Sequence, residues 1–248
     1  MRKTLLIAAA ALAAGVISSQ AQVYSQNIVG YVNVPVNGGY TAVTTPLDVG
    51  NNSVTNYFDY TSGANDGSII ATWAGTHYVQ TMFDSTKSTG FTDAASGTQT
   101  LPPPVLAPGQ GWLFNNQNAS NTITFAGTVH VDGAGASTNI VGVDTNILSS
   151  STVYVYPSSK LPIGGGVSSV LGLTNPGGVL DGSIIVIPNI VGGAIHGYNQ
   201  VMFDSSKATG FTDAASGTQT LAEPVISVGG SFLFSNQTGS PVSWIQSL

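Results

Sequence analysis

One segment of this chain occurs twice, and this internal repeat limits the possible folds more than any other feature of the sequence. Residues 80–101 and 200–221 are identical at 19 of 22 positions and differ only at 81/201, 86/206 and 88/208. The correspondence extends beyond this segment, at an offset of 120 residues towards the C-terminus and of 115 and then 112 towards the N-terminus. The chain therefore repeats one structural unit, with short insertions in loops of the second copy.

The offsets place the two copies, repeat 1 and repeat 2, at residues 23–126 and 137–248. Residues 127–136 lie between them and include the run Asp-Gly-Ala-Gly-Ala, a composition typical of flexible linkers. We expect two separable domains in preference to one fused, pseudo-symmetric body.

Each copy consists of short apolar, β-branched runs that glycine and proline interrupt. In repeat 1 these runs cover residues 28–34, 41–45, 68–73, 78–83, 111–114 and 122–125. The only helical spacing is short, over residues 53–58 and, in repeat 2, over 167–173. The pattern predicts an all-β fold with two tandem sandwich-like or barrel-like repeats, each with at most one short helix.

The N-terminus has the layout of a secretory signal peptide, residues 1–21. Arg2 and Lys3 precede an apolar run, and the small residues Ser19 and Ala21 precede the expected cleavage point. The apolar run is shorter than the ~20 residues that a membrane-spanning helix needs. We expect an exported protein with no membrane span after cleavage, located outside the cell, on its surface or in the periplasm.

The charge balance excludes several classes of partner. The chain has 5 basic and 11 acidic residues, and cleavage of the signal peptide removes two of the basic ones. Nucleic acids and anionic membranes both require basic surface, so neither is an expected partner. A hydrophobic content of 42% nevertheless supplies enough apolar material for folded cores.

Several motifs together resemble a known family. They are Asn-Ile-Val-Gly-Tyr-Val-Asn-Val at 27–34, Thr-Pro-Leu-Asp at 45–48, Asp-Gly-Ser-Ile-Ile at 66–70, Pro-Gly-Gln-Gly-Trp-Leu-Phe at 108–114 and Thr-Ile-Thr-Phe-Ala-Gly-Thr-Val at 122–129. With the export signal, this pattern resembles an uncharacterised family of exported bacterial twin-repeat β proteins. Repeat 2 departs from it, because residues 228–232 lack the proline and the tryptophan. The resemblance implies the fold and supplies no catalytic residues.

Residues suited to catalysis are sparse. The chain has no cysteine and no Gly-x-Ser-x-Gly motif, and its three histidines do not stand at metal-ligand spacing. Alternation along a strand would place His130 and Asp132 on one face. The single glutamate, Glu223, has a proline as its counterpart in repeat 1. We therefore expect a protein that is not an enzyme and needs no cofactor.

Four aspartates recur in the duplicated segment: Asp84 and Asp93 in repeat 1, and Asp204 and Asp213 in repeat 2. The first interpretation is structural, because aspartate carboxylates often accept backbone N–H bonds in turns. The second is a calcium site formed by the paired carboxylates and nearby hydroxyl oxygens. Lys87, in the same loop, counts against the second interpretation.

Aromatic residues supply the remaining candidate site. Trp73, Tyr78, Trp112 and Tyr198 are candidates for a flat platform on which a sugar ring would stack. The alternative is that these side chains pack in the core, and the alignment of Trp112 with Phe232 suits that alternative.

These observations favour a non-catalytic structural or adhesive protein of the cell surface or extracellular space. Its expected partner is an extracellular polymer, another surface protein or a second copy of itself. The alternative function is a pair of carbohydrate-binding modules. The near-identity of the duplicated segment indicates either recent sequence exchange or two copies of one binding surface, and the latter would permit bivalent attachment.

Overall fold

Short β-strands make up almost all of the regular structure, which confirms the expected all-β class. The structure is a computed structural model that describes residues 29–130, 143–148 and 154–247. The predicted signal peptide and residues 131–136 of the predicted linker lie outside these ranges. The elements of repeat 1 are β1 (Val29–Val36), β2 (Gly39–Thr44), η1 (Val54–Asn56), β3 (Ile69–Trp73), β4 (Tyr78–Phe83), β5 (Phe91–Asp93), β6 (Gly111–Asn116) and β7 (Asn121–Thr128). Those of repeat 2 are β8 (Val143–Leu148), β9 (Gly165–Gly166), η2 (Pro176–Gly178), β10 (Ile184–Val191), β11 (Ala194–Phe203), β12 (Phe211–Asp213), β13 (Val225–Ile226), β14 (Leu233–Ser235) and β15 (Val242–Ser247).

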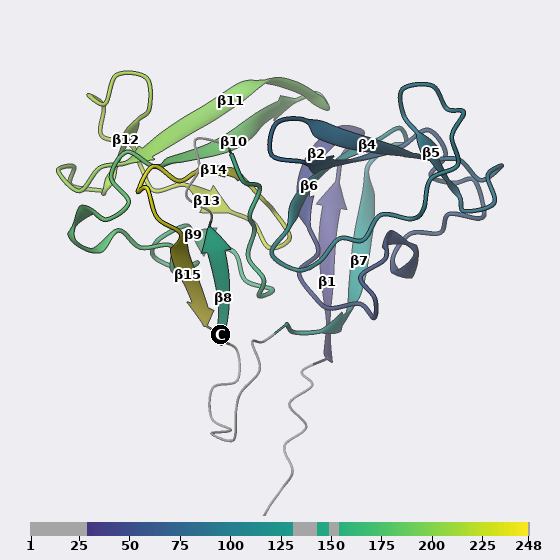
Figure 1. The fold of residues 1–248 in the computed structure, drawn as a ribbon, viewed down its shortest axis with the longest axis horizontal. Coiled ribbons are helices and arrows are strands. Elements are labelled where there is room, and N and C mark those ends of the chain that lie inside the picture. Colours follow the sequence, from purple (N-terminus) through teal and green to yellow (C-terminus); the bar gives the residue numbers. More distant parts are fainter. Residues whose placement is uncertain (1–28, 131–142, 149–153, 248) are drawn as a thin grey trace, which may run out of the picture.

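Repeat 1 has two antiparallel sheets around one core (Figure 1). The larger sheet has the order β2-β6-β3-β4-β5, and β1 pairs with β7 in the smaller one. Alternation along β1 and β7 turns Val34, Val36, Ile123 and Phe125 inwards, where all four are buried. Strand β7 ends at Thr128, two residues inside the predicted linker.

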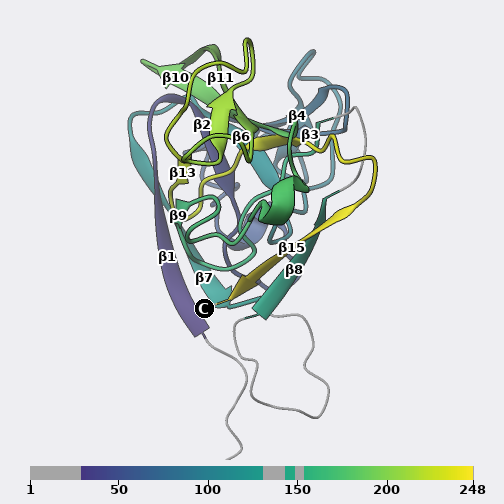
Figure 2. The same cartoon turned by 90° about the vertical axis from the view of Figure 1, so that its left-hand side faces the viewer.

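Repeat 2 pairs its strands in a similar way. Its larger sheet has the order β12-β11-β10-β14, and β15 pairs with β8. The matching hairpins share their register, since Phe83 faces Phe91 across β4–β5 and Phe203 faces Phe211 across β11–β12. Figure 2 views the molecule from the repeat 2 end, with β8 and β15 in front and β1 and β7 behind. The boundaries at 23–126 and 137–248 stay predictions.

The two expected helices have different outcomes. In repeat 1, η1 is a single 3₁₀ turn whose N-cap, Ser53, accepts a bond from Thr55 N. The expected helix over 167–173 is wrong. Val170 N and Leu171 N both bond to Gly166 O, at 3.0 and 2.9 Å, which forms turns rather than a helix.

A third buried cluster joins the two repeats. It contains Leu113 with its counterpart Leu233, and Ala71 with its counterpart Val186, packed together with Tyr156. Equivalent faces of the two larger sheets therefore bury one another. Such burial of matched apolar surface is the usual basis of a self-complementary interface.

Backbone hydrogen bonds also cross between the repeats, and they come in a matched pair. Thr44 N donates to Gly229 O at 2.8 Å, and Ser158 N donates to Gly109 O at 3.0 Å. The hydroxyls of the same two donor residues, Thr44 and Ser158, lie 2.5 Å apart. Gly109 and Gly229 are counterparts at the offset of 120, and Thr44 and Ser158 pair with the counterparts Gly111 and Ser231, so the two bonds indicate a local pseudo-twofold relation.

The β10–β11 hairpin reaches from repeat 2 across to β2 of repeat 1 (Figure 1). Tyr40 N donates to Gly193 O at 2.7 Å. The backbones of Gly39 and Gly193 approach so closely that a Cβ atom on either would collide with the other repeat. These contacts join the two repeats and favour the fused, pseudo-symmetric alternative, while the expectation of two separable domains stays a prediction.

Candidate functional site

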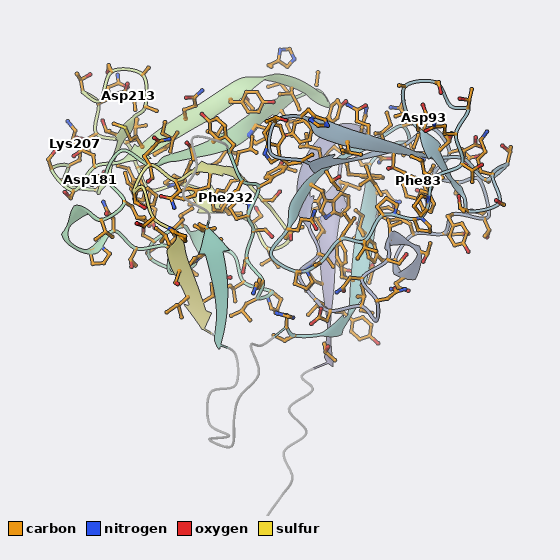
Figure 3. The ribbon with its side chains drawn as sticks, in the orientation of Figure 1. Phe83, Asp93, Asp181, Lys207, Asp213 and Phe232 are labelled. Atoms are coloured by element: carbon orange, nitrogen blue, oxygen red, sulfur yellow. The ribbon has the colours of Figure 1, made fainter. Side chains whose placement is uncertain are left out.

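The duplicated segment forms matching loops at opposite ends of the molecule. We call residues 84–101, which follow β4, end loop 1, and residues 204–221, which follow β11, end loop 2. Figure 3 shows Asp93 and Asp213, one from each loop, at opposite ends of the long axis. The two copies therefore face away from one another.

Local sequence sets the shape of each end loop. Gly90 and Gly210 have φ of 79° and 78°, a conformation that side chains other than glycine rarely adopt. Thr89 Oγ1 donates to Leu101 O at 2.5 Å, and Thr209 Oγ1 donates to Leu221 O at 2.6 Å. The same residues therefore form the same turns in both repeats.

Asp93 and Asp213 are turn-capping residues. The Asp93 carboxylate accepts bonds from Ser96 N, Thr98 N and Gln99 N at 2.6, 3.2 and 2.9 Å. Asp213 accepts the equivalent three bonds at 2.6, 3.2 and 2.8 Å. The Gln99 and Gln219 N–H bonds are the largest influence holding both carboxyl pKa values below their ordinary range.

Asp84 and Asp204 have a similar local role. Asp84 Oδ1 accepts from Thr86 N at 3.0 Å and from Thr86 Oγ1 at 2.5 Å, and Asp204 accepts from Ser206 in the same way. Lys87 Nζ lies 4.0 Å from Asp84 Oδ2. The described residues contain no group of three or more acidic, histidine or cysteine side chains placed to hold a metal ion. This geometry favours turn caps over the calcium interpretation.

The four candidate aromatic side chains do not form one platform. Trp112 is fully buried in the core of repeat 1, so its ring has no face for a ligand. Trp73 and Tyr78 contact each other edge to face at 4.8 Å beside the inter-repeat cluster, and Trp73 Nε1 donates to Tyr154 O at 2.6 Å. Tyr198, which is 44% exposed, remains accessible.

Tyr78 shows the effect of its position between the repeats. Its hydroxyl is buried and has no hydrogen-bond partner among the described residues. Burial, and then the nearby Tyr198, raise the pKa of Tyr78 to about 12. Its packing is that of an interface residue.

Glu223 lies in a hollow of repeat 2 with a volume of about 460 Å³. Its Oε1 accepts from Ser168 N and Ser169 N at 2.5 and 2.7 Å, and its Oε2 accepts from Ser169 Oγ at 2.7 Å. Burial raises the pKa of Glu223, but the bonds from Ser169 and Ser168 outweigh it and the net shift is downwards. The described residues lining this hollow include no aspartate or histidine that would pair with Glu223.

A second hollow, of about 850 Å³, lies in repeat 1 and contains a residue that the sequence interpretation missed. That residue is Tyr31, which is 77% exposed and lines the hollow beside Asp48 and Asn56. Alternation along β1 predicts an outward position for Tyr31, and a large aromatic residue at an outward position is the signal that would have identified it.

His130 contacts an acidic residue that lies far from it in the sequence. His130 Nδ1 lies 2.6 Å from Asp48 Oδ2, and Asp48 lines this second hollow. The expectation that Asp132 shares a strand face with His130 stays a prediction, because Asp132 lies outside the described residues.

Comparisons with known proteins add no relationship: no family model, curated protein or solved structure matches the chain. Within the described part of the chain, every helix is too short to cross a membrane.

Proposed function

We propose that the chain is an exported, non-catalytic interaction protein that attaches bivalently to an extracellular polymer or to another surface protein. The observation that carries this proposal is the position of the end loops. Loops with nearly the same sequence and the same turns lie at both ends of a body that a shared buried cluster holds together. Two linked attachments raise the overall affinity by roughly 10²- to 10⁴-fold over one.

The roles of the acidic side chains support a non-catalytic function. In the end loops, the aspartate carboxylates accept bonds from backbone N–H groups of their own turns. Glu223 likewise accepts two backbone N–H bonds. Acid–base catalysis needs a carboxyl with a pKa near the working pH, whereas these bonds lower the pKa.

The test compares arginine substitutions at two matched, exposed alanines, Ala95 and Ala215. Wild type, Ala95→Arg, Ala215→Arg and the double variant are measured for retention on cellulose, chitin, peptidoglycan and cell envelopes. We expect each single variant to lose roughly 10²-fold in apparent affinity and the double variant to lose more. Retention that either single substitution leaves unchanged would contradict bivalent attachment, as would the absence of binding to every surface.

Carbohydrate binding stays the second candidate, because of Tyr31. An exposed aromatic ring beside Asp48 and Asn56 combines a stacking face with groups that form hydrogen bonds. The test is polysaccharide binding by Tyr31→Ala. Binding that this substitution abolishes, and that Ala95→Arg and Ala215→Arg leave unchanged, would favour this candidate over the first.

A further inference from the structure

The two end loops have different neighbours, although their sequences nearly match. In repeat 1, the ring of Tyr60 stacks on Phe91 with ring centroids 6.0 Å apart and planes 27° apart. The same ring covers Gly90 so closely that a Cβ atom there would collide with it. Gly90 is buried as a result.

Among the described residues of repeat 2, no ring covers Gly210, although the neighbouring Phe211 is itself buried. Asp66 accepts a bond from Ser85 N, just after β4, and Asp181 accepts the equivalent bond from Ser205 N, just after β11. This match sets the offset between the repeats at 115 residues here, and the same offset aligns Tyr60 with Asn175. The Asn175 side chain is engaged elsewhere, with Nδ2 donating to Asp181 Oδ1 at 2.7 Å and Oδ1 accepting from Leu180 N at 2.6 Å.

The consequence is a hollow above Gly210. A Cβ atom built on Gly210 would meet no described atom within 4 Å. The hollow measures about 460 Å³, within the usual size range of small-ligand pockets. Gly210 lines it, as Gly90 lies under Tyr60, and the lining also includes Glu223, Ser169 and an almost fully buried Phe211.

The side containing Glu223 can recognise a hydroxyl group. A carboxylate oxygen has two acceptor positions, and Glu223 Oε2 accepts a bond only from Ser169 Oγ among the described residues. One position on Oε2 therefore remains for a donor that enters the hollow. A phenol combines a flat ring with such a donor.

We propose that this hollow binds the side chain of a tyrosine from another polypeptide, and that Tyr60 is the built-in equivalent of that ligand in repeat 1. The matching glycine is the basis for choosing a phenol over a sugar ring, because the same chain already seats a tyrosine ring against Gly90, the counterpart of the open Gly210. The site goes beyond the bivalent attachment proposed above and does not depend on it.

The experiment uses isotopically labelled protein and N-acetyl-L-tyrosinamide as the probe, with amide chemical shifts as the readout. We expect saturable shifts at Gly210, Phe211 and Ser169, with a Kd on the order of 1 mM for so small a ligand. Gly90 and Phe91 are internal controls with matching sequence, and their amides should not move.

Two exchanged substitutions test the assignment. Asn175→Tyr should fill the hollow and abolish the shifts at Gly210, whereas Tyr60→Asn should open repeat 1 and produce a second set of shifts at Gly90. If Asn175→Tyr fails to fold, Tyr60→Asn decides alone.

Three results would overturn the proposal. They are no shift at Gly210 in wild type, equal shifts at Gly90 and Gly210 in wild type, and no new shift at Gly90 in Tyr60→Asn. A fourth would do so as well: larger shifts at Gly210 with glucose, xylose or N-acetylglucosamine than with the tyrosine probe, which would assign the site to sugars.

Discussion

End loop 1 and end loop 2 have the same internal structure and different surroundings. Their hydrogen bonds match to within 0.1 Å, as at Thr89–Leu101 and Thr209–Leu221. Gly90 is nevertheless buried and Gly210 partly exposed, because a tyrosine covers only the first. Local sequence therefore sets the shape of each loop, whereas residues elsewhere in the chain decide what each loop presents.

The largest expected effect tests whether the matched cores are equivalent. Phe83 and Phe203 are both buried, and each packs against the following phenylalanine of its hairpin at a ring distance of 5.0 Å. Truncation to alanine removes contacts and leaves a cavity, so Phe83→Ala and Phe203→Ala should each cost about 3–5 kcal/mol of unfolding free energy. Urea unfolding measures the loss.

The same experiment tests whether the repeats form one body. Because a shared cluster joins them, both variants should unfold in one transition at a similar urea concentration. Two separate transitions, with only one of them displaced in each variant, would show that the repeats unfold independently and would contradict the fused description.

The next effect concerns the place where the copies meet. Thr44→Val removes one hydroxyl of the buried pair with Ser158, and Ser158→Ala removes the other. Each should cost about 1–3 kcal/mol, since each leaves a buried partner with one bond fewer. The double variant should cost less than the sum of the singles, because the two hydroxyls interact directly. Strict additivity in urea unfolding would show that the 2.5 Å contact contributes nothing.

A smaller effect separates the two loops by burial. Thr89 and Thr209 make the same hydroxyl bond, but Thr89 is partly covered and Thr209 is exposed. Thr89→Val should lower the unfolding free energy by about 1 kcal/mol. Thr209→Val should lower it less, because water replaces the lost hydrogen bond more readily at an exposed site. If thermal unfolding shows a larger loss of stability in Thr209→Val than in Thr89→Val, burial by neighbouring residues does not distinguish the two loops.

Much of the strand structure followed from short-range pattern. The run 78–83 was predicted with the bounds that β4 has, because β-branched and aromatic residues are frequent there and glycine-containing gaps flank the run. The turn-capping role of Asp93 was likewise visible, since its partners are three to six residues away.

The failures involve partners that are distant in sequence. Strand β7 continues to Thr128 because Asp48 N and O both pair with it, at 2.8 and 3.0 Å, and the same approach brings Asp48 to His130. No local pattern gives a partner 82 residues away. The hollow above Gly210 was missed for the same reason, because it depends on which residue aligns with Tyr60.

The smallest effect tests whether the loops respond alike to acid. Backbone N–H bonds depress the pKa values of Asp93 and Asp213, so both carboxyls should stay ionised at pH 3, where an ordinary aspartate, with a pKa of about 3.9, is mostly protonated. A carboxyl whose pKa is lower in the folded than in the unfolded state stabilises the fold at pH values above its unfolded-state pKa. This stabilisation is lost as the pH falls through the folded-state pKa. Carboxyl NMR titration should give matching curves for the two residues, while Asp59, with a pKa of about 2, has no counterpart acid in repeat 2. Asp93→Asn and Asp213→Asn identify the two signals. Either carboxyl titrating near pH 4, or a separation of a full pH unit between them, would show that the loops differ internally and not only in their neighbours.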